Sequence, residues 1–536
     1  MASKPQAGVE QSIIVFGGEG ELEILLTDTG NARRLKEECG DDCRFCLEEK
    51  VWYVWNDELG VWRKDPLELQ VSFKAKLTFQ KLRSQWRTAK KEIEPKLESF
   101  KHKLTKKLEP RADKEMQLTH DESDILNNYT QAAALEHWYT ISENATRISS
   151  AIIMLRSEPR MAIHTGQFDA DPYLFNCANG TFDLRESTVV REHRREDFCS
   201  MQAPVTADWS LGAEQRPLFE DFLQRIMPDK DKLLFLQRYF GLALSGLADE
   251  RVIPILLGGG ANGKGVWLRV MNGILGEDGG YACMAAMSSF LQPKFSNADE
   301  TRNDLVALIG KRLVTVSETN TKSPPLNAAL LKCFAGGDGN LRIRGNWESL
   351  RNFTPTGKLI LATNNEPQID DDSDGMWDRT CKVWFDVQVP KAEQDVDLVN
   401  KILATEKSAI LAWMLEGWAA YWNDRQTGNA GLTKPVSIEK DTTEYRDSQS
   451  QVAAFIQACY WIVKQKDGIP QTSTAIYERY KHWCDATGER HKTQTSMAIE
   501  LLKFGRRNGI TKERKENGIY WYGLKPSDMV QPDPNP

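Results

Sequence analysis

Seven consecutive residues near the middle of the chain have the types and spacing needed to hold phosphate groups. The segment Gly258-Gly259-Gly260-Ala261-Asn262-Gly263-Lys264 fits the pattern G-x-x-x-x-G-K. Glycines let backbone N–H groups turn inward around phosphate oxygens, and the lysine can reach the β- and γ-phosphates. A Gly-rich loop can be a mere turn, but an apolar strand pattern (Ile253–Leu257) precedes this one and a helical pattern (Val266–Leu275) follows. This order predicts a P-loop that binds ATP. The expected nucleotide-binding residues are Gly258, Gly259, Gly260, Ala261, Asn262, Gly263, Lys264, Gly265 and Val266.

The Mg²⁺ ion that accompanies ATP lacks its usual hydroxyl ligand in this sequence. Gly265 follows Lys264, at the position where P-loops carry Ser or Thr. A second apolar strand pattern, Leu313–Val316, ends in Ser317-Glu318. A carboxylate there can polarise the attacking water and help to hold hydrated metal, although most glutamates after a strand are surface residues. We therefore expect Glu318 to be catalytic and to hold Mg²⁺ directly or through water.

Two further polar residues follow in the order typical of P-loop ATPases. A third strand pattern, Leu359–Ala362, leads to Thr363-Asn364-Asn365, and an Asn at a strand tip can sense the γ-phosphate or be an ordinary turn residue. Arg379 comes fifteen residues after Asn364. An arginine at this place can project into a neighbouring subunit's site and neutralise transition-state charge. Lys264, Glu318, Asn364 and Arg379 are thus the expected catalytic set.

These motifs, packed within about 120 residues, resemble superfamily 3 helicases, and most of all the phage/plasmid primase–helicase family that includes poxvirus and satellite-phage proteins. Three other segments are similar to parts of that family: Leu331–Asp338, Phe175–Gly180, and the N-terminal region with Leu26–Ala32, Trp55 and Trp62. The resemblance covers most of the chain, with the helicase part towards its C-terminus. It implies a homohexameric ring that hydrolyses ATP at subunit interfaces and translocates on single-stranded or forked DNA.

The resemblance also implies a β-hairpin that lines the channel of the ring. Asn340–Gly345 and Leu350–Phe353 could form its arms, or could form an ordinary surface hairpin. Arg342 and Arg344 alternate along a strand and would share one face. Aromatic and basic side chains in such a position stack on bases or grip the backbone. The expected channel contacts are Arg342, Arg344, Trp347 and Arg351.

Charge and element order point to a second DNA contact near the C-terminus. The net charge is −7, but Lys74–Lys114 has 14 Lys and Arg against 5 Asp and Glu, and Gln451–Val530 has 13 against 8. Helical patterns at Val452–Lys464, Thr474–Ala486 and Thr493–Asn508 precede two strand patterns, Ile510–Arg514 and Gly518–Leu524. Three helices before a hairpin is the order of a winged helix, although a small helical packing domain is also possible. Its third helix would bind DNA through Lys503, Arg506 and Arg507.

The whole chain is predicted to be an α/β P-loop (AAA+-like) ATPase core with an α+β N-terminal domain and a C-terminal winged-helix domain. At roughly 100–200 residues per domain, 536 residues suggest several domains. The predicted segments are a small β-rich unit (1–66), a mostly helical collar (67–210), the ATPase core (211–390), a helical extension and linker (391–440), the winged helix (441–526) and a tail (527–536). Strand patterns at Ser12–Phe16 and Lys50–Trp55 and an Asn179–Gly180 turn signal lie in the first part.

Several motifs that resemble sites are better explained by structure. Cys39, Cys43 and Cys46 form C-x3-C-x2-C without a nearby fourth zinc ligand, so packing is the simpler explanation. Asp169 and Asp171 resemble the acid pair of primase polymerases, but no convincing partner follows, and we expect no primase activity in this chain. Trp52, Trp55 and Trp62 are expected in the core.

The sequence thus predicts an ATP-dependent DNA helicase and replication initiator of a phage or other mobile element. Its expected partners are DNA, further copies of itself and a separate primase or polymerase. No signal peptide or membrane span is evident, which with ten scattered cysteines predicts a cytoplasmic protein of a bacterial host. Two alternatives remain open: an origin-binding protein that uses ATP only as an assembly switch, and a P-loop NTPase of defence or regulation without unwinding.

Overall fold

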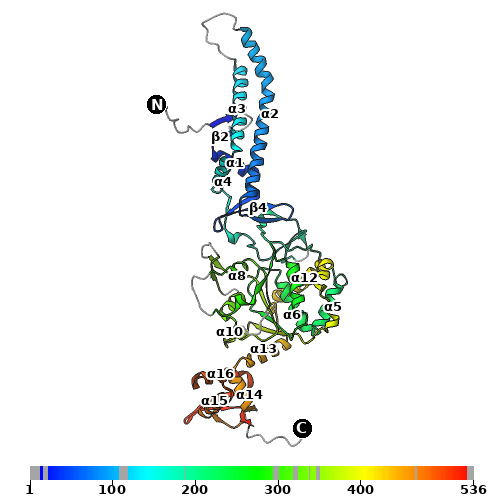
Figure 1. The fold of residues 1–536 in the computed structure, drawn as a ribbon, viewed down its shortest axis with the longest axis vertical. Helices are drawn as coiled ribbons and strands as arrows, with labels where there is room; N and C mark the ends of the chain where they lie inside the picture. The colour runs from blue at the N-terminus through cyan, green and yellow to red at the C-terminus, as the bar shows by residue number, and fades with distance from the viewer. Residues whose placement is uncertain are drawn as a thin grey trace. The chain divides into compact units, whose positions relative to one another are not determined.

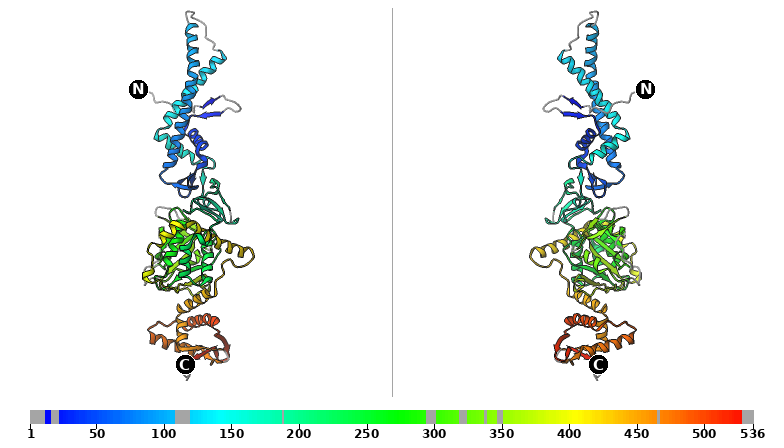
Figure 2. Two further views of the ribbon diagram at one scale, coloured as in Figure 1. Left: turned by 90° about the vertical axis from the view of Figure 1, so that its right-hand side faces the viewer. Right: turned by 90° about the vertical axis from the view of Figure 1, so that its left-hand side faces the viewer.

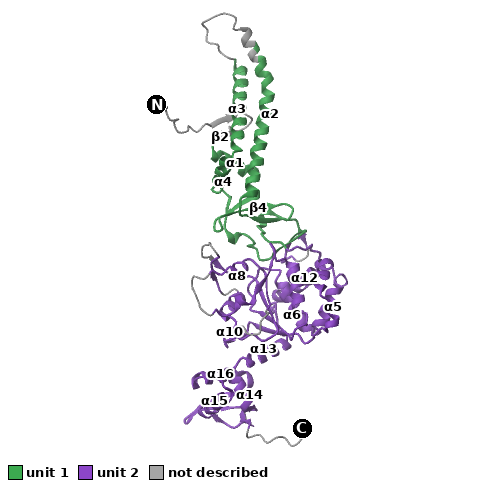
Figure 3. Ribbon diagram, viewed as in Figure 1, with its two compact units in different colours: residues 1–181, 191–202 green, residues 182–190, 203–536 purple. Residues whose placement is uncertain are grey.

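Figure 1 shows the computed structural model, which describes residues 12–15, 22–107, 119–186, 189–293, 301–317, 324–336, 339–345, 351–464 and 467–527. The chain divides into two compact units (Figure 3). The first comprises residues 1–181 and 191–202, and the second comprises residues 182–190 and 203–536. Within the described ranges, no helix is both long and apolar enough to cross a membrane.

The first unit combines a small sheet with a long helical hairpin. Its strands are β1 (Ser12–Val15), β2 (Leu22–Leu25), β3 (Cys43–Cys46), β4 (Val51–Asn56), β5 (Val61–Asp65), β6 (Ala162–Ile163) and β7 (Leu174–Cys177). Its helices are α1 (Asp28–Cys39), α2 (Leu69–Lys107), α3 (His120–Ser142) and α4 (Ala145–Leu155). The sheet order is β5-β4-β3-β6. Helices α2 and α3 lie side by side in Figures 1 and 2.

The start of α2 is fixed by one buried carboxylate. Asp65, the last residue of β5, accepts hydrogen bonds from the backbone N–H groups of Leu69, Gln70 and Val71 at 2.8, 2.9 and 3.0 Å. The first N–H groups of a helix have no partner within the helix, so a carboxylate there satisfies them and complements the helix dipole. The side chains of Ala75 and Phe79 on α2 are buried with those of α1, α3 and α4. Residues 28–39, expected within a β-rich segment, are instead helical.

The boundary between the two units falls at β8 (Gly180–Asp183) and β9 (Val190–Arg191). The predicted turn Asn179–Gly180 leads into β8, whose first residue, Gly180, has a φ of 149°. This boundary lies inside the segment 67–210 that the sequence predicted as one collar.

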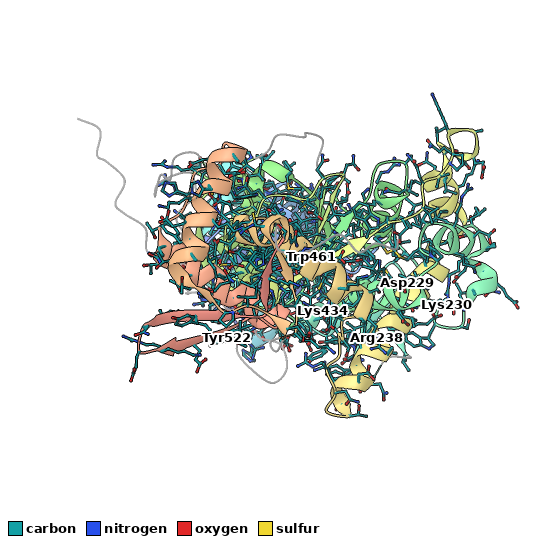
Figure 4. The ribbon with its side chains drawn as sticks, turned by 90° about the horizontal axis from the view of Figure 1, so that it is seen from below. Asp229, Lys230, Arg238, Lys434, Trp461 and Tyr522 are labelled. Atoms are coloured by element: carbon teal, nitrogen blue, oxygen red, sulfur yellow. The ribbon has the colours of Figure 1, made fainter. Side chains whose placement is uncertain are left out.

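The second unit contains the helices α5 (Pro217–Ile226), α6 (Lys230–Leu242), α7 (Lys264–Leu275), α8 (Asn303–Val306), α9 (Ala328–Phe334), α10 (Asp374–Trp377), α11 (Leu398–Thr405), α12 (Lys407–Gln426) and α13 (Val436–Ser448). Between them lie the strands β10 (Ile253–Leu257), β11 (Ala282–Ala286), β12 (Leu313–Ser317), β13 (Leu341–Ile343), β14 (Arg351–Phe353), β15 (Lys358–Thr363) and β16 (Thr380–Trp384). Figure 4 labels Arg238 on α6, whose guanidinium pairs with Asp424 of α12 at 2.7 Å.

A five-stranded parallel sheet forms the centre of this unit. Its order is β11-β12-β15-β10-β16. Every residue of β10 and β15 is buried, as expected for parallel strands covered on both faces. The sequence therefore predicted a mixed α/β architecture correctly, including the strands that became β10, β12 and β15. It did not predict β11 or β16.

Two buried cations hold the starts of β12 and β15 against the segment that follows α6. The Lys358 ammonium donates to the carbonyl oxygens of Ser245 and Thr356, at 2.9 and 3.0 Å, and to that of Leu247. The Arg312 guanidinium donates to the Leu244 carbonyl and lies 4.5 Å from the centre of the Tyr281 ring. Burial, and then Arg312, lower the pKa of Lys358 to about 7. These contacts fix the amino ends of the strands. The Gly258–Lys264 loop and Asn364 lie at the opposite, carboxyl ends of β10 and β15.

The C-terminal part of this unit consists of α14 (Gln451–Cys459), β17 (Tyr460–Ile462), β18 (Gln471–Thr472), α15 (Ser473–Thr487), α16 (Gln494–Asn508), β19 (Thr511–Lys515), β20 (Gly518–Tyr522) and β21 (Leu524–Pro526). Three helices and a closing hairpin were expected in this order. However, the first helix ends at Cys459 rather than Lys464, because Tyr460–Ile462 pair with β21. Figure 4 labels Trp461 of β17 and Tyr522 of β20.

Candidate functional site

The segment Gly258–Lys264 is a loop between the carboxyl end of β10 and the first turn of α7. Gly260, Ala261 and Gly263 have φ values of +93°, +52° and +80°. Glycine is required at 263 by geometry as well as by space, because a Cβ there would lie 2.7 Å from Cγ2 of Ile226. The non-glycine Ala261 in a left-handed conformation is a local strain of the kind that concentrates at functional sites.

The mouth of the loop is open. A Cβ built at Gly259, Gly260 or Gly265 would meet no atom within 4 Å. The backbone therefore borders space that a phosphate chain could fill, next to the N-terminus of a twelve-residue helix. Val266 follows in the first turn of α7 and is half-buried.

Lys264 is buried, with 5% of its surface exposed. Its ammonium donates to the carbonyl oxygen of Gly258 at 2.9 Å and to Oδ1 of Asn262 at 2.8 Å. It also lies 3.3 Å from Oδ1 of Asn364. All three acceptors are neutral, and burial lowers the pKa of Lys264 to about 8. A cation placed in this way is suited to receive an anion.

Asn364 reaches Lys264 because β10 and β15 are adjacent and parallel. Leu257, the last residue of β10, lies opposite Thr363, the last residue of β15. The Thr363 hydroxyl donates to the carbonyl of Asn365 at 2.8 Å and accepts from the N–H of Asn365 at 3.2 Å. This tight turn exposes the Asn364 side chain at the strand tip, so two residues one hundred positions apart in sequence meet at one point.

The expected metal-binding residue cannot be placed with them. Glu318 lies outside the described residues, and β12 ends at Ser317, which is opposite Ala362 of β15. The carboxyl end of β12 therefore lies beside that of β15, at the same sheet edge as the Gly258–Lys264 loop. Gly265 is exposed and supplies no hydroxyl.

Arg379, expected to act on a neighbouring subunit, is bonded within its own chain. It is 9% exposed, and its Nε and Nη1 donate to the carbonyl oxygens of Ala335 and Gly375 at 3.0 and 2.6 Å. Its position directly before β16 places it at the amino end of that strand. To act across an interface, the guanidinium would have to leave these carbonyls.

The predicted hairpin is present as the antiparallel pair β13 and β14, with Arg342 opposite Asn352. Arg342 is exposed and Arg344 half-buried, while Ile343 between them is buried in the main core of the second unit. The alternation predicted for the two arginines therefore fits the observed burial. Trp347 and the side chain of Arg351 lie outside the described part of the chain.

On α16, two of the three expected DNA contacts are held by carboxylates. The Lys503 ammonium lies 3.2 Å from Oδ2 of Asp372, and the Arg507 guanidinium lies 2.9 Å from Oδ1 of Asp447. Arg506 is exposed. The same Asp372 also pairs with Arg446 of α13, at 3.1 Å. Lys503 thus joins α16 to the loop between Asn364 and α10, and Arg507 joins α16 to α13.

A second basic surface in this region was not anticipated. All five residues of β19 are exposed, and they include Lys512, Arg514 and Lys515. Lys515 also lies over the rings of Tyr520 and Tyr522, at 5.6 and 5.3 Å. The sequence signal that could have predicted this surface is the alternation of Lys512 and Arg514 in one strand pattern, next to the aromatic residues of the following strand.

The basic segment of α2 is partly neutralised within the first unit. Lys74 pairs with Asp42 at 2.8 Å, and Lys90 pairs with Glu136 of α3 at 2.9 Å. Arg83 likewise pairs with Glu143 at 2.9 Å. The local excess of positive charge counted in the sequence is therefore larger than the excess that the folded unit presents.

The motifs assigned to structure have structural partners. Cys39, Cys43 and Cys46 are buried, as are Trp52, Trp55 and Trp62. The Asp169 carboxylate accepts from the N–H of Ser200 at 3.0 Å, and that of Asp171 accepts from the N–H of Tyr173 at 3.0 Å. Asp171 thus orders a local turn, whereas Asp169 ties its loop to a segment 31 residues further along the chain.

Comparison with known proteins finds similar viral proteins whose names assign them as helicases or primases. Residues 32–228 match the family described as D5 N terminal like. A protein of Acanthamoeba polyphaga mimivirus, provisionally named helicase L207/L206, is 29% identical over 339 residues, covering 59% of this chain and 33% of its own length. An African swine fever virus protein, provisionally named primase C962R, is 24% identical over 310 residues, covering 54% and 31%. This chain therefore spans about a third of the length of these curated relatives.

A solved structure of the NrS-1 C-terminal region aligns with 71% of this chain and 90% of its own, at 12% identity and a TM-score of 0.38. That likeness is too low to establish a common fold.

Proposed function

On the premise that the chain belongs to the D5-like primase–helicase family, we propose that it is an ATP-dependent DNA helicase and replication initiator of the superfamily 3 type. In this proposal the ATPase core contains the parallel sheet, the Gly258–Lys264 loop is its P-loop, and the C-terminal part from α14 onward is a winged helix. The active form is a homohexameric ring on single-stranded or forked DNA, working with a separate primase or polymerase.

The observation that carries the proposal is the position of the Lys264 ammonium. It lies between the loop of β10 and the tip of β15, held by the neutral oxygens of Gly258, Asn262 and Asn364. A buried cation gains most from an anionic ligand, and the open glycines beside it leave room for one. A nucleotide phosphate fits both the charge and the space.

The proposal assigns a role to each of the expected site residues. Backbone N–H groups of the loop and Lys264 hold the phosphates. Asn364 senses the γ-phosphate, because its contacts differ according to whether that group is bound. Glu318 would help to hold Mg²⁺, which would supply neutralisation of phosphate charge, and would polarise the attacking water. Arg379 completes the site across a subunit interface after leaving the Ala335 and Gly375 carbonyls.

DNA contacts belong to two surfaces. In the channel, the hairpin β13–β14 contributes Arg342, Arg344, Trp347 and Arg351. Outside it, α16 contributes Lys503, Arg506 and Arg507. The hairpin lies along the chain between the strand that precedes Glu318 and the strand that ends before Asn364, so it can move with the nucleotide state.

Strand displacement on a forked DNA substrate tests the proposal. The wild-type protein should unwind with ATP, and a folded Lys264→Ala variant should neither hydrolyse ATP nor unwind, because it lacks the cation that faces the phosphates. Replacing both Arg344 and Trp347 by Ala should abolish unwinding and leave basal ATPase. Wild-type turnover by Lys264→Ala would contradict the P-loop assignment.

A second function is favoured by one feature of the sequence. Gly265 removes the usual hydroxyl ligand of Mg²⁺, which suits a protein that binds ATP more than it hydrolyses it. Such a protein would be an origin-binding initiator that uses ATP as an assembly switch. It would form ATP-dependent oligomers on DNA without displacing a strand.

A further inference from the structure

The Asn262 side chain is buried in the Gly258–Lys264 loop, with 4% of its surface exposed. Its Oδ1 accepts a hydrogen bond from the Lys264 ammonium at 2.8 Å. Its Nδ2 has no hydrogen-bond partner among the residues that the structure describes. Exchanging the two atoms would not remove this imbalance, since an N–H group would then face the ammonium and repel it.

A buried amide N–H without an acceptor is costly, at about 1–3 kcal/mol. The loop nonetheless makes space for it. A Cβ at Gly258 would lie 1.9 Å from Nδ2, so glycine at 258 is what allows this amide to occupy its position. The loop therefore holds a buried donor beside a buried cation, and the same loop contains Gly259 and Gly260, where a Cβ would meet no atom within 4 Å.

We propose that Asn262 is a side-chain ligand of the nucleotide phosphates: Nδ2 donates to a phosphate oxygen while Oδ1 positions the Lys264 ammonium. This inference rests on the proposed function and assigns a specific task to one side chain of the loop. It explains both halves of the amide, since the anion supplies the acceptor that Nδ2 lacks in the free protein.

Aspartate at 262 separates the two halves of this role. It keeps the shape and the oxygen that faces Lys264, but it turns the phosphate-facing donor into an acceptor with negative charge. Asn262→Asp should therefore weaken binding of ATP and ADP by roughly 10- to 100-fold, the range for losing a hydrogen bond to a charged group. Asn423→Asp, on the exposed surface of α12, adds the same charge elsewhere and should bind nucleotide as the wild type does.

Binding is measured by calorimetric titration of ADP, which needs no turnover, and thermal unfolding is followed for each variant. Asn262→Ala, which adds no charge, should also bind at least about tenfold more weakly. It replaces the aspartate variant if that one does not fold. Unchanged affinity in a folded Asn262 variant, with the wild type binding ADP, would overturn the Asn262 role alone. A wild type that binds no nucleotide would overturn the proposed function and this role together.

A measurement without nucleotide tests whether the Asn262 side chain positions the Lys264 ammonium. The amine reactivity of Lys264 towards a trace acylating reagent, followed by mass spectrometry across pH, reports its titration in the free protein. Burial among neutral acceptors sets its midpoint near 8. A carboxylate at 262 should move that midpoint to higher pH, whereas Asn423→Asp should leave it in place. No movement in Asn262→Asp would show that residue 262 does not position the ammonium.

Discussion

At the scale of single residues, the buried ammonium of Lys264 couples nucleotide binding to pH. Burial lowers its pKa from the ordinary 10.5 to about 8, and a bound phosphate would favour the charged form and raise the pKa again. Binding near pH 8.5 should therefore take up protons, and affinity should fall as pH rises through about 8. Titration calorimetry in two buffers of different ionisation enthalpy measures this uptake.

Lys264→Arg is the matched variant, since a guanidinium stays charged and should show no uptake. Identical heats in both buffers for the wild type would contradict the coupling. The same lowered pKa of Lys264 also makes the free energy of unfolding depend on pH. Because the unfolded chain binds the proton more tightly, the contribution of Lys264 to the free energy of unfolding should rise between pH 8 and 10.5.

Gly265 permits a gain-of-ligand experiment. No atom lies within 4 Å of a Cβ at this position, so a Cβ can be added there without moving its surroundings. Gly265→Ser should supply the missing hydroxyl and lower the Mg²⁺ concentration for half-maximal ATPase several-fold. Gly265→Ala adds the same Cβ without the hydroxyl. Equal Mg²⁺ dependence of the two variants would show that the hydroxyl finds no metal there.

At the scale of elements, Arg379 joins the end of α9 to α10 through the carbonyls of Ala335 and Gly375. Arg379→Ala should therefore destabilise the fold by about 1–3 kcal/mol, the cost of leaving buried acceptors without a donor. If Arg379 also acts in trans, mixing Arg379→Ala with Lys264→Ala should restore part of the ATPase activity, because some interfaces then contain both intact halves. A lowered melting temperature without recovery in demonstrated mixed rings would leave only the structural role.

Between α16 and the loop after Asn364, a DNA phosphate would compete with the Asp372 carboxylate for Lys503. Asp372 holds Lys503 and Arg446, so a DNA phosphate must replace this carboxylate to bind Lys503. Asp372→Asn should therefore tighten duplex binding and make it more salt-dependent, because each freed cation can release one more counterion. Asp485→Asn, an exposed acid on α15, controls for net charge. Fluorescence anisotropy over a salt series distinguishes the two, and equal slopes would exclude the competition.

Local patterns predicted the elements, and long-range pairing determined the rest. The β-branched and leucine-rich strand β10 was evident, whereas β11, with the sequence Ala-Cys-Met-Ala-Ala, lacks the residues that favour strands. The motif order named Lys264 and Asn364 as candidates for one site, and the structure places their side chains 3.3 Å apart. The partners of Arg379 and Lys503 could not be predicted, because they lie on segments whose meeting depends on strand order and helix packing.

At the scale of the molecule, the structure locates where the C-terminal part can be removed. The predicted boundary at residue 440 lies inside α13, whose Tyr445 is fully buried in the core of the second unit and whose Thr442 accepts from the N–H of Lys382. A chain ending at Gln449 keeps these contacts. It should retain ATPase activity and lose most of its duplex affinity and salt dependence, measured by anisotropy. Unchanged DNA affinity would show that the removed C-terminal part is a packing domain and does not bind DNA.

The position of β10 within the sheet has a consequence for synthesis. Ile255 pairs with Leu361 on one side and Lys382 on the other, so both neighbours of this strand are made long after it. At about 5–20 residues per second, the roughly one hundred residues that separate them take about 5–20 s to emerge. During that interval, the nascent chain contains an apolar strand and its glycine loop, but neither of the strands that pair with it. Slowing translation beyond residue 260 should therefore lengthen the period in which a chaperone can be crosslinked to this segment, and release should follow the appearance of residue 384.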